Sequence, residues 1–339
     1  MNKYFDSILL TGATGFLGKQ VFNELIKRGY RRIVSVGNKG VFSSEQLNGD
    51  FRRVDLRDDQ VVNQLFRFAP HQIPNLKGVI NLAATVGGIG ANQKRPADFM
   101  MDSLRIGINL IDASVHNRNM QSGGKFVQIG TVCAYPKFAH IPFKEDDLWN
   151  GYPEETNAPY GIAKKTLMEL VRTYNIQYPN KFRGINLIPV NLYGPGDNFN
   201  LETSHVIPAL IRKFDTAKLN NEDSVTLWGT GEASREFLYV EDAAEGIVDA
   251  FEKYQENYPV NLGTGKEIKI IDLAEHIANL IEYDGTIFFD SSKPDGQPRR
   301  CLDVSRAQQK FGFVAKTPFF EGLVKTVRWY QENREWLTQ

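Results

Sequence analysis

Short apolar runs alternate with helical stretches along the first half of the chain. The run at residues 7–10 leads into a glycine-rich turn, and Val21, Leu25 and Ile26 then follow at the spacing of a helix. Further strands are expected from the largely apolar segments at 32–36, 78–84, 125–130 and 185–190, and the segment at 51–54 leads into Asp55. Strands that alternate with helices predict a doubly wound, parallel α/β sheet, whose ligands bind at the carboxyl ends of the strands.

The pattern changes at about residue 198. Helices are expected at 205–214, 271–281 and 320–336, and a short strand at 225–228. We therefore expect a dinucleotide-binding domain over residues 1–190 and a smaller α/β substrate-binding domain over 191–339. Some later segments are expected to return to the main sheet.

Three glycines at three-residue intervals follow the first apolar run, directly before the first helix. Glycines in such a turn let the backbone approach a pyrophosphate, and the helix N-terminus presents free N–H groups to it. This strand, turn and helix predict a Rossmann-type dinucleotide site. Its residues are Gly12, Thr14, Gly15, Phe16, Leu17 and Gly18.

The second strand ends without the acidic residue that often holds the ribose of NAD. It offers Asn38 and Lys39, and a lysine there favours the 2′-phosphate of NADP(H), although Lys39 could equally be a solvated loop charge. Asp55 could accept a hydrogen bond from the adenine amino group, or cap the following helix. Four small or apolar residues complete the expected cofactor site: Leu56, Leu82, Ala83 and Ala84.

A tyrosine and a lysine lie four residues apart after Pro159, which suits a first helical turn. Tyr160 and Lys164 therefore share a helix face, although such pairs also occur by chance. Because a nearby cation favours the phenolate, we expect Lys164 to lower the pKa of Tyr160 toward neutrality. Thr131, at the end of the strand expected at 125–130, could hydrogen-bond the carbonyl oxygen that Tyr160 protonates.

Composition narrows the class of protein. The 40 basic and 40 acidic residues cancel, which gives no support for a nucleic-acid or membrane-surface partner. No stretch approaches the ~18 apolar residues of a membrane span, and we expect a cytoplasmic protein. The cysteines, Cys133 and Cys301, are too few for a disulfide scaffold, and no Cys/His cluster suggests a metal.

Several segments resemble those of the extended short-chain dehydrogenase/reductases, in particular the GDP-L-fucose synthase group, over nearly the whole chain. They lie at 86–92, 133–137, 191–199, 204–210, 228–238 and 293–300. The resemblance implies an NADP(H)-dependent epimerase/reductase of a nucleotide-linked 4-keto-6-deoxy sugar. The implied reaction converts GDP-4-keto-6-deoxymannose to GDP-L-fucose or a related GDP-deoxysugar. A homodimer through helices at 97–114 and 159–178 is also implied.

The resemblance further implies residue roles. Tyr160 would protonate the C4 oxygen, and Lys164 would support it electrostatically and bind the cofactor ribose, so both residues also belong to the expected cofactor site. Cys133 and His205 would form the acid/base pair of epimerisation, although a buried cysteine and a helix-capping histidine are the structural alternatives. Trp228 could pack on the nucleotide or belong to the core. The expected substrate contacts are Val86, Gly87, Asn191, Lys213, Trp228, Arg235 and Arg300.

The chain departs from the group's pattern at two places. Thr131 replaces the usual serine, and Ala13 and Thr14 replace a histidine and an arginine, so NAD(H) stays open as the cofactor. The alternatives are a 4-epimerase with tightly bound NAD and a 4-reductase without epimerisation. A 4,6-dehydratase would need an acidic residue where Val132 and Cys133 stand, and a cofactor-sensing binding protein would tend to lose the Tyr/Lys pair.

Overall fold

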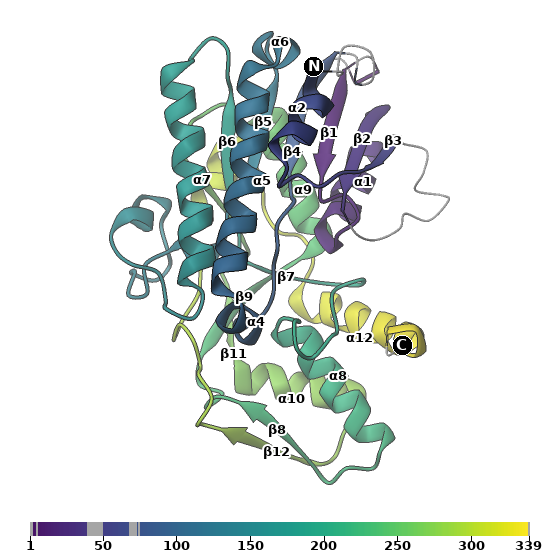
Figure 1. The fold of residues 1–339 in the computed structure, drawn as a ribbon. Helices are drawn as coiled ribbons and strands as arrows, with labels where there is room; N and C mark the ends of the chain where they lie inside the picture. Colours follow the sequence, from purple (N-terminus) through teal and green to yellow (C-terminus); the bar gives the residue numbers. More distant parts are fainter. Residues whose placement is uncertain (1–2, 5, 39–49, 68–72, 74, 338–339) are drawn as a thin grey trace.

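A parallel sheet forms the centre of the computed structural model, which describes residues 3–4, 6–38, 50–67, 73 and 75–337 (Figure 1). All of its pairings in this part of the chain are parallel, which confirms the predicted α/β class. Seven strands are found among the described residues, in the order β10 (Val260–Leu262), β6 (Gly184–Pro189), β5 (Lys125–Ile129), β4 (Leu76–Asn81), β1 (Ser7–Thr11), β2 (Arg32–Gly37) and β3 (Asp50–Arg53).

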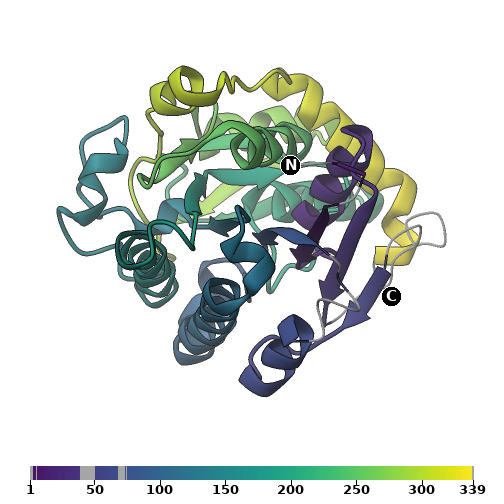
Figure 2. The same ribbon diagram turned by 90° about the horizontal axis from the view of Figure 1, so that it is seen from above.

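Helices cover both faces of the sheet (Figure 2). One layer contains α2 (Asp59–Arg67), α5 (Pro96–His116) and α7 (Ala158–Gln177), and the other contains α1 (Phe16–Lys27) and α9 (Val240–Lys253). Shorter helices lie in the connections: α4 (Ile89–Lys94), α6 (Arg118–Gln121), η2 (Val132–Ala134), η3 (Glu145–Trp149) and α11 (Ser305–Phe311).

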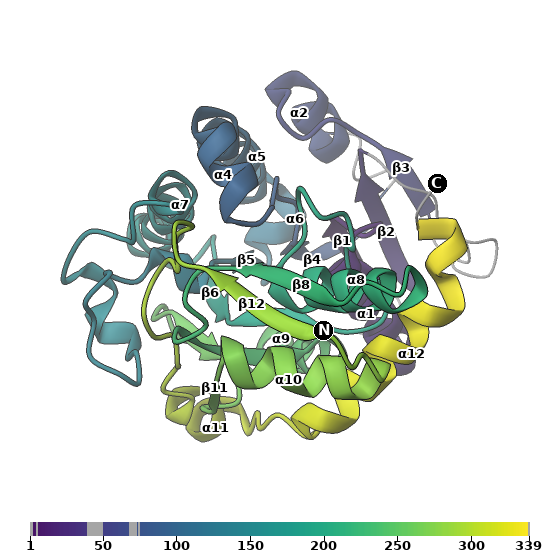
Figure 3. The same cartoon turned by 90° about the horizontal axis from the view of Figure 1, so that it is seen from below.

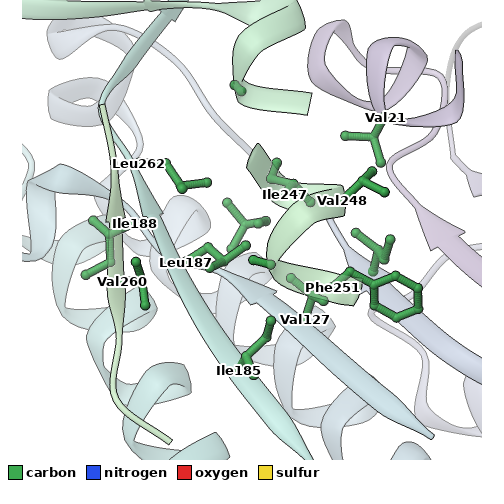
Figure 4. Packing of buried hydrophobic residues seen from close by; sticks show 14 of the residues in the cluster. Val21, Val127, Ile185, Leu187, Ile188, Ile247, Val248, Phe251, Val260 and Leu262 are labelled. Carbon is green, nitrogen blue, oxygen red and sulfur yellow. The ribbon is translucent and has the colours of Figure 1, made fainter. Parts of the chain in front are cut away.

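Alternate residues of the central strands enter two different hydrophobic cores. Leu9 and Val79 pack in the core under α5 and α7, whereas Leu10 and Ile80 pack in the core under α1 and α9. Figure 4 shows the second core, where Ile247 of α9 lies among side chains of the sheet. Both faces are buried, which explains why these strands read as continuous apolar runs.

The later part of the chain builds a smaller unit beyond the carboxyl ends of the strands (Figure 3). Its aromatic core includes Tyr193, Phe214 and Phe237. The pairing of β12 with β8 was not predicted from the sequence. The elements are β7 (Asn191–Tyr193), β8 (Ser224–Trp228), β9 (Ser234–Tyr239), β11 (Glu267–Lys269), β12 (Thr286–Asp290), α8 (Val206–Leu219), α10 (Ile270–Ile281) and α12 (Phe319–Leu337).

Two elements that follow β7 in sequence lie with the main sheet. The strand β10 pairs with β6 and forms one edge of the sheet, and α9 packs along α1 on the opposite layer from α7. None of the helices in the described ranges is long and apolar enough to cross a membrane. Within those ranges, no group of three or more His, Cys, Asp or Glu residues could hold a metal ion.

Candidate active site

The glycine turn between β1 and α1 is shaped by backbone contacts. Gly12 has a φ of +67°, and a Cβ there would lie 2.9 Å from the amide nitrogen of Ala83. A Cβ on Gly18 would collide with the carbonyl oxygen of Gly12. Gly15 is the N-cap of α1 and has no side chain to occupy the first-turn amides. The turn therefore fits a pyrophosphate held by backbone N–H groups.

Thr14, Phe16 and Leu17 belong to the same turn and helix start. The hydroxyl of Thr14 lies where a Cβ on Gly37 would come within 2.7 Å of it, so the turn packs against the end of β2. Asn38 follows β2 and is exposed, while Lys39 lies outside the described residues. The structure therefore adds no contact for the expected 2′-phosphate ligand.

Asp55, the expected adenine partner, is held by Arg57. The Nη2 of Arg57 lies 2.7 Å from Asp55, and its Nη1 lies 3.3 Å from Asp102. These hydrogen bonds from Arg57 lower the pKa of Asp55. The capping alternative for Asp55 is wrong, because the carboxylate of Asp58 accepts from the first-turn amides of α2. The remaining expected cofactor residues lie near these strand ends: buried Leu56, and half-buried Leu82, Ala83 and Ala84 after β4.

Tyr160 and Lys164 lie on α7 as the sequence predicted, but their electrostatics differ. Lys164 is buried, its Nζ donates to the Ile129 carbonyl at 3.0 Å, and it lies 5.9 Å from the Tyr160 ring centroid. Burial lowers the pKa of Lys164 to about 8. Tyr160 is half-buried, and the protein around its hydroxyl raises its pKa, which Cys133 raises further. The prediction that Lys164 lowers the pKa of Tyr160 is therefore wrong for the protein alone.

Thr131 and Cys133 reach the same place from the end of β5. Thr131 is the N-cap of η2, and its hydroxyl oxygen accepts from the Cys133 amide at 3.2 Å. A Cβ on Gly161 would collide with the Cys133 carbonyl oxygen, so η2 and the first turn of α7 meet backbone to backbone. This close approach puts the free, half-buried thiol of Cys133 near Tyr160.

His205 is the N-cap of α8 and comes from the smaller unit. The residue as a whole is exposed to solvent, but the protein near its imidazole disfavours the imidazolium, and so does the charge of Arg300. Both effects lower the pKa of His205. The preceding Thr203 carbonyl accepts from the Gly88 amide at 3.1 Å, which attaches this segment to the loop containing Val86 and Gly87.

Arg235 and Arg300 are both buried in the same region. Arg235 donates to the carbonyls of Ser234, at 2.7 Å, and Asp295, at 2.8 Å. Arg300 donates to Gln297 at 3.0 Å. Burial, and after it the charge of Arg300, lowers the pKa of Arg235 to about 9, whereas a Cys133 thiolate would raise it. The site therefore contains two guanidinium groups, a thiol and a phenol.

The other expected substrate residues include Asn191, Lys213 and Trp228, which differ in their contacts and exposure. Asn191 donates to the carbonyl of Glu236 at 2.9 Å, and Lys213 donates to the carbonyl of Thr226 at 3.0 Å. Trp228 is 56% exposed and its ring lies beside Gly90 of α4, so its core alternative is wrong. An exposed aromatic ring is available for contact with a ligand.

The family model for the NAD dependent epimerase/dehydratase family matches residues 8–263. The chain belongs to this family. It is 38% identical over 326 residues to "Probable GDP-L-fucose synthase 1" of Oryza sativa subsp. japonica, which covers 96% of this chain and 92% of that protein. The resemblance stated from the sequence is thereby confirmed, and the chain is an enzyme of the short-chain dehydrogenase/reductase type.

Solved structures agree with this membership of the epimerase/dehydratase family. A crystal structure of a GDP-6-OMe-4-keto-L-xylo-heptose reductase from C. jejuni superposes with a TM-score of 0.84, at 28% identity over 98% of this chain and 99% of that one. A GDP-L-fucose synthetase from Naegleria fowleri bound to NADP superposes with a TM-score of 0.77, at 28% identity over 97% and 95% of the two chains.

One buried residue of this epimerase/dehydratase site was missed by sequence reasoning. The carboxylate of Glu236 accepts from the backbone N–H groups of Gly265, at 2.8 Å, and Leu302, at 2.6 Å. It thereby ties three segments together behind Arg235. Its sequence signal is a charged residue inside a strand, β9, whose every position is buried.

Proposed function

We propose that this enzyme is an NADP(H)-dependent epimerase/reductase of a GDP-linked 4-keto-6-deoxy sugar. The reaction would convert GDP-4-keto-6-deoxymannose to GDP-L-fucose or a related GDP-deoxysugar. The observation that carries the proposal is that Cys133 lies close enough to act electrostatically on both Tyr160 and the buried Arg235, while the buried Arg300 acts on both Arg235 and His205. A simple ketone reductase would need no thiol and imidazole there. The names of the similar proteins support a GDP-sugar substrate.

The residues of the glycine turn suit an NADP(H) cofactor. Gly12 and Gly15 leave room for a pyrophosphate at the N-terminus of α1, and Ala83 and Ala84 lie beside the turn. The similar Naegleria fowleri structure is described as bound to NADP, which supports NADP(H) over NAD(H). When bound, NADPH supplies a hydride to the C4 carbonyl of the sugar. Lys164 would hold the cofactor ribose from the other side of the cleft.

Tyr160 would give a proton to the C4 oxygen during reduction. Its raised pKa means that the free protein holds the phenol in the protonated form that a proton donor needs. The Thr131 oxygen already accepts from the Cys133 amide, and its own hydrogen remains to be donated to the same carbonyl oxygen. The two hydroxyls would also stabilise negative charge on that oxygen during epimerisation.

Cys133 and His205 would exchange protons at the carbons beside the ketone. Cys133 belongs to η2 and His205 is the N-cap of α8, so the two groups would approach the sugar from two different elements. One group removes the C–H proton to leave an enolate, and the other returns a proton to the opposite face, which inverts the centre. The lowered pKa of His205 leaves it neutral near pH 7 before substrate binds.

We also propose a homodimer located in the cytoplasm. The paired helices α5 and α7 present apolar side chains to solvent: Met101 and Ile108 are 45% and 44% exposed, and Ile176 is 60% exposed. An apolar surface on two adjacent helices favours packing against a second copy. The two free cysteines suit a reducing compartment.

The test follows two signals from one reaction. The purified enzyme is incubated with GDP-4-keto-6-deoxymannose in deuterated water, with and without NADPH. We expect deuterium at C3 and C5 in both cases, and NADPH oxidation when the cofactor is present. Cys133→Ser should lose deuterium uptake and still bind NADPH, whereas Tyr160→Phe should lose oxidation.

Other outcomes would contradict the proposal in distinct ways. NADPH oxidation without deuterium uptake would identify a 4-reductase, the activity named for the similar C. jejuni structure. Neither signal, together with tightly bound NAD in the purified protein, would identify a 4-epimerase. Normal oxidation by Tyr160→Phe would remove Tyr160 from the mechanism.

A further inference from the structure

A row of polar side chains crosses the middle of the sheet. Thr11 of β1 is in register with Asn81 of β4, and Asn81 is in register with Gln128 of β5. All three are buried, with exposures of 0% or 1%. Two residues earlier on each strand, the same face presents apolar side chains to the core under α5 and α7. The row therefore replaces core residues at the carboxyl ends of the strands, next to the site.

These side chains form a hydrogen-bonded chain in one direction. The Thr11 hydroxyl donates to Asn81 Oδ1 at 2.8 Å, and Asn81 Nδ2 donates to Gln128 Oε1 at 3.0 Å. Gln128 Nε2 then donates to the carbonyl of Ile129 at 2.9 Å. Lys164 Nζ donates to that same oxygen at 3.0 Å. Every donor in the row thus points toward the carbonyl that holds the lysine.

Thr11, the first residue of this hydrogen-bonded row, lies next to the glycine turn of the expected cofactor site. The amide of Ala83 donates to the Thr11 hydroxyl oxygen at 3.3 Å, and Gly12 follows Thr11 directly. A carbonyl oxygen has two lone pairs, and in Ile129 one serves Gln128 and the other serves Lys164. Gln128 therefore fixes the peptide group on which the lysine rests.

We propose that Gln128, aligned by Asn81 and Thr11, is a positioning residue that orients Lys164 for ketone reduction. This inference rests on the proposed role of Lys164 as the partner of Tyr160. A row of apolar side chains would fill the same space without the cost of burying three polar side chains. We attribute the polar row to the contact at its end, where Gln128 and Lys164 both donate to the Ile129 carbonyl. A shift of Lys164 by about 1 Å would slow reduction about tenfold to a hundredfold.

The experiment is a double-mutant cycle on the hydride-transfer step. NADPH oxidation is measured in single turnovers at saturating sugar for Gln128→Met, Lys164→Met and the double variant. We expect Gln128→Met to be at least tenfold slower with an unchanged KM, and the double variant to be no slower than Lys164→Met. If the two single variants slow reduction by factors that multiply in the double variant, the inference is overturned and Gln128 is a purely stabilising residue.

A matched control comes from the same row. Asn186 of β6 is in register with Gln128, is equally buried, and donates to the carbonyl of Met168 instead. The factor by which Asn186→Leu slows reduction should multiply with the factor for Lys164→Met, because Asn186 does not act through the lysine. If Asn186→Leu is instead masked by Lys164→Met as Gln128→Met is, the row has no specific connection to the lysine and the inference fails.

A second variant guards against loss of folding in Gln128→Met. In Gln128→Glu the shape is kept, but the ionised side chain cannot donate to Ile129 and adds a negative charge within about 6 Å of Lys164 Nζ. Reduction should slow. If the reaction needs the Lys164 ammonium, the pH above which reduction declines should also rise, because the added negative charge raises the pKa of Lys164. Unchanged rate and profile would overturn the inference. Wild-type reduction by Lys164→Met would instead refute the proposed function itself.

Discussion

The guanidinium groups of Arg235 and Arg300 are buried together, and each faces the charge of the other. Burial and the charge of Arg300 lower the pKa of Arg235 to about 9, so the free protein carries an electrostatic cost at this pair. A ligand that brings two negative charges would offset that cost. We therefore propose that the pair binds a diphosphate, which would also account for arginines that are held by carbonyl oxygens and an amide rather than by carboxylates.

The first prediction concerns the affinity for GDP. Arg235→Met and Arg300→Met should each weaken GDP binding about tenfold to a hundredfold, because charge-assisted hydrogen bonds to phosphate are lost. Calorimetric titration measures this loss, and GDP should raise the unfolding temperature less than in the unaltered protein. The control is Arg299→Met, since Arg299 is exposed and pairs with Glu267. Equal losses in all three variants would contradict a specific site.

The second prediction concerns the protonation of His205. The protein around the imidazole and the charge of Arg300 lower the pKa of His205 in the free protein, and a bound diphosphate would offset the charge of Arg300. The pKa of His205 should therefore rise when GDP binds, which would prepare an imidazolium that can return a proton. An NMR titration of the histidine ring with and without GDP measures this change. In Arg300→Met the free protein should already show a higher pKa, and a fall on binding would refute the argument.

The third prediction is a loss of reduction at alkaline pH. Burial lowers the pKa of Lys164 to about 8, so its ammonium is present below that pH and is lost above it. If reduction needs the ammonium, kcat/KM should be constant below about pH 8 and fall above it. Lys125 is the control, because burial also lowers its pKa to about 8 while it caps α9 through the carbonyl of Phe251. Lys125→Met should keep the alkaline decline, and its disappearance would assign the decline to the wrong lysine.

The fourth prediction concerns the glycine turn. Gly12→Ala places a Cβ at positive φ and 2.9 Å from Ala83, and should lower the free energy of unfolding by about 1–3 kcal/mol. It should also abolish NADPH binding, which fluorescence titration measures. Gly29→Ala is the matched control, since Gly29 has a φ of +88° with nothing within 4 Å of its Cβ. It should lose stability and keep its affinity for NADPH.

The sequence was sufficient where a function depends on spacing along one element. The glycine turn and the shared helix face of Tyr160 and Lys164 were predicted in this way. The raised pKa of Tyr160 was not predictable, because burial of its hydroxyl depends on how η2 packs against α7. The helical spacing alone suggested the opposite direction.

Contacts between distant segments were also beyond sequence reasoning. Nothing along the chain shows that Thr11, Asn81 and Gln128 are in register, since that depends on strand order. Their signal was present as polar residues at equivalent ends of three apolar strands. The sequence left open whether Trp228 contacts the nucleotide or belongs to the core, and it is exposed because it lies on the solvent-facing side of β8, whose positions alternate between exposed and buried.

The return of α9 and β10 to the main sheet limits how such an enzyme can change its substrate. A recombination event that exchanged everything after β7 would also replace a helix and an edge strand of the cofactor half. The side chains of the new α9 would then have to pack against those of the existing α1 without cavities or overlaps. We therefore expect new sugar preferences to evolve through point substitutions and loop exchanges around Trp228 and Arg300. The cofactor half and the smaller unit are then inherited together.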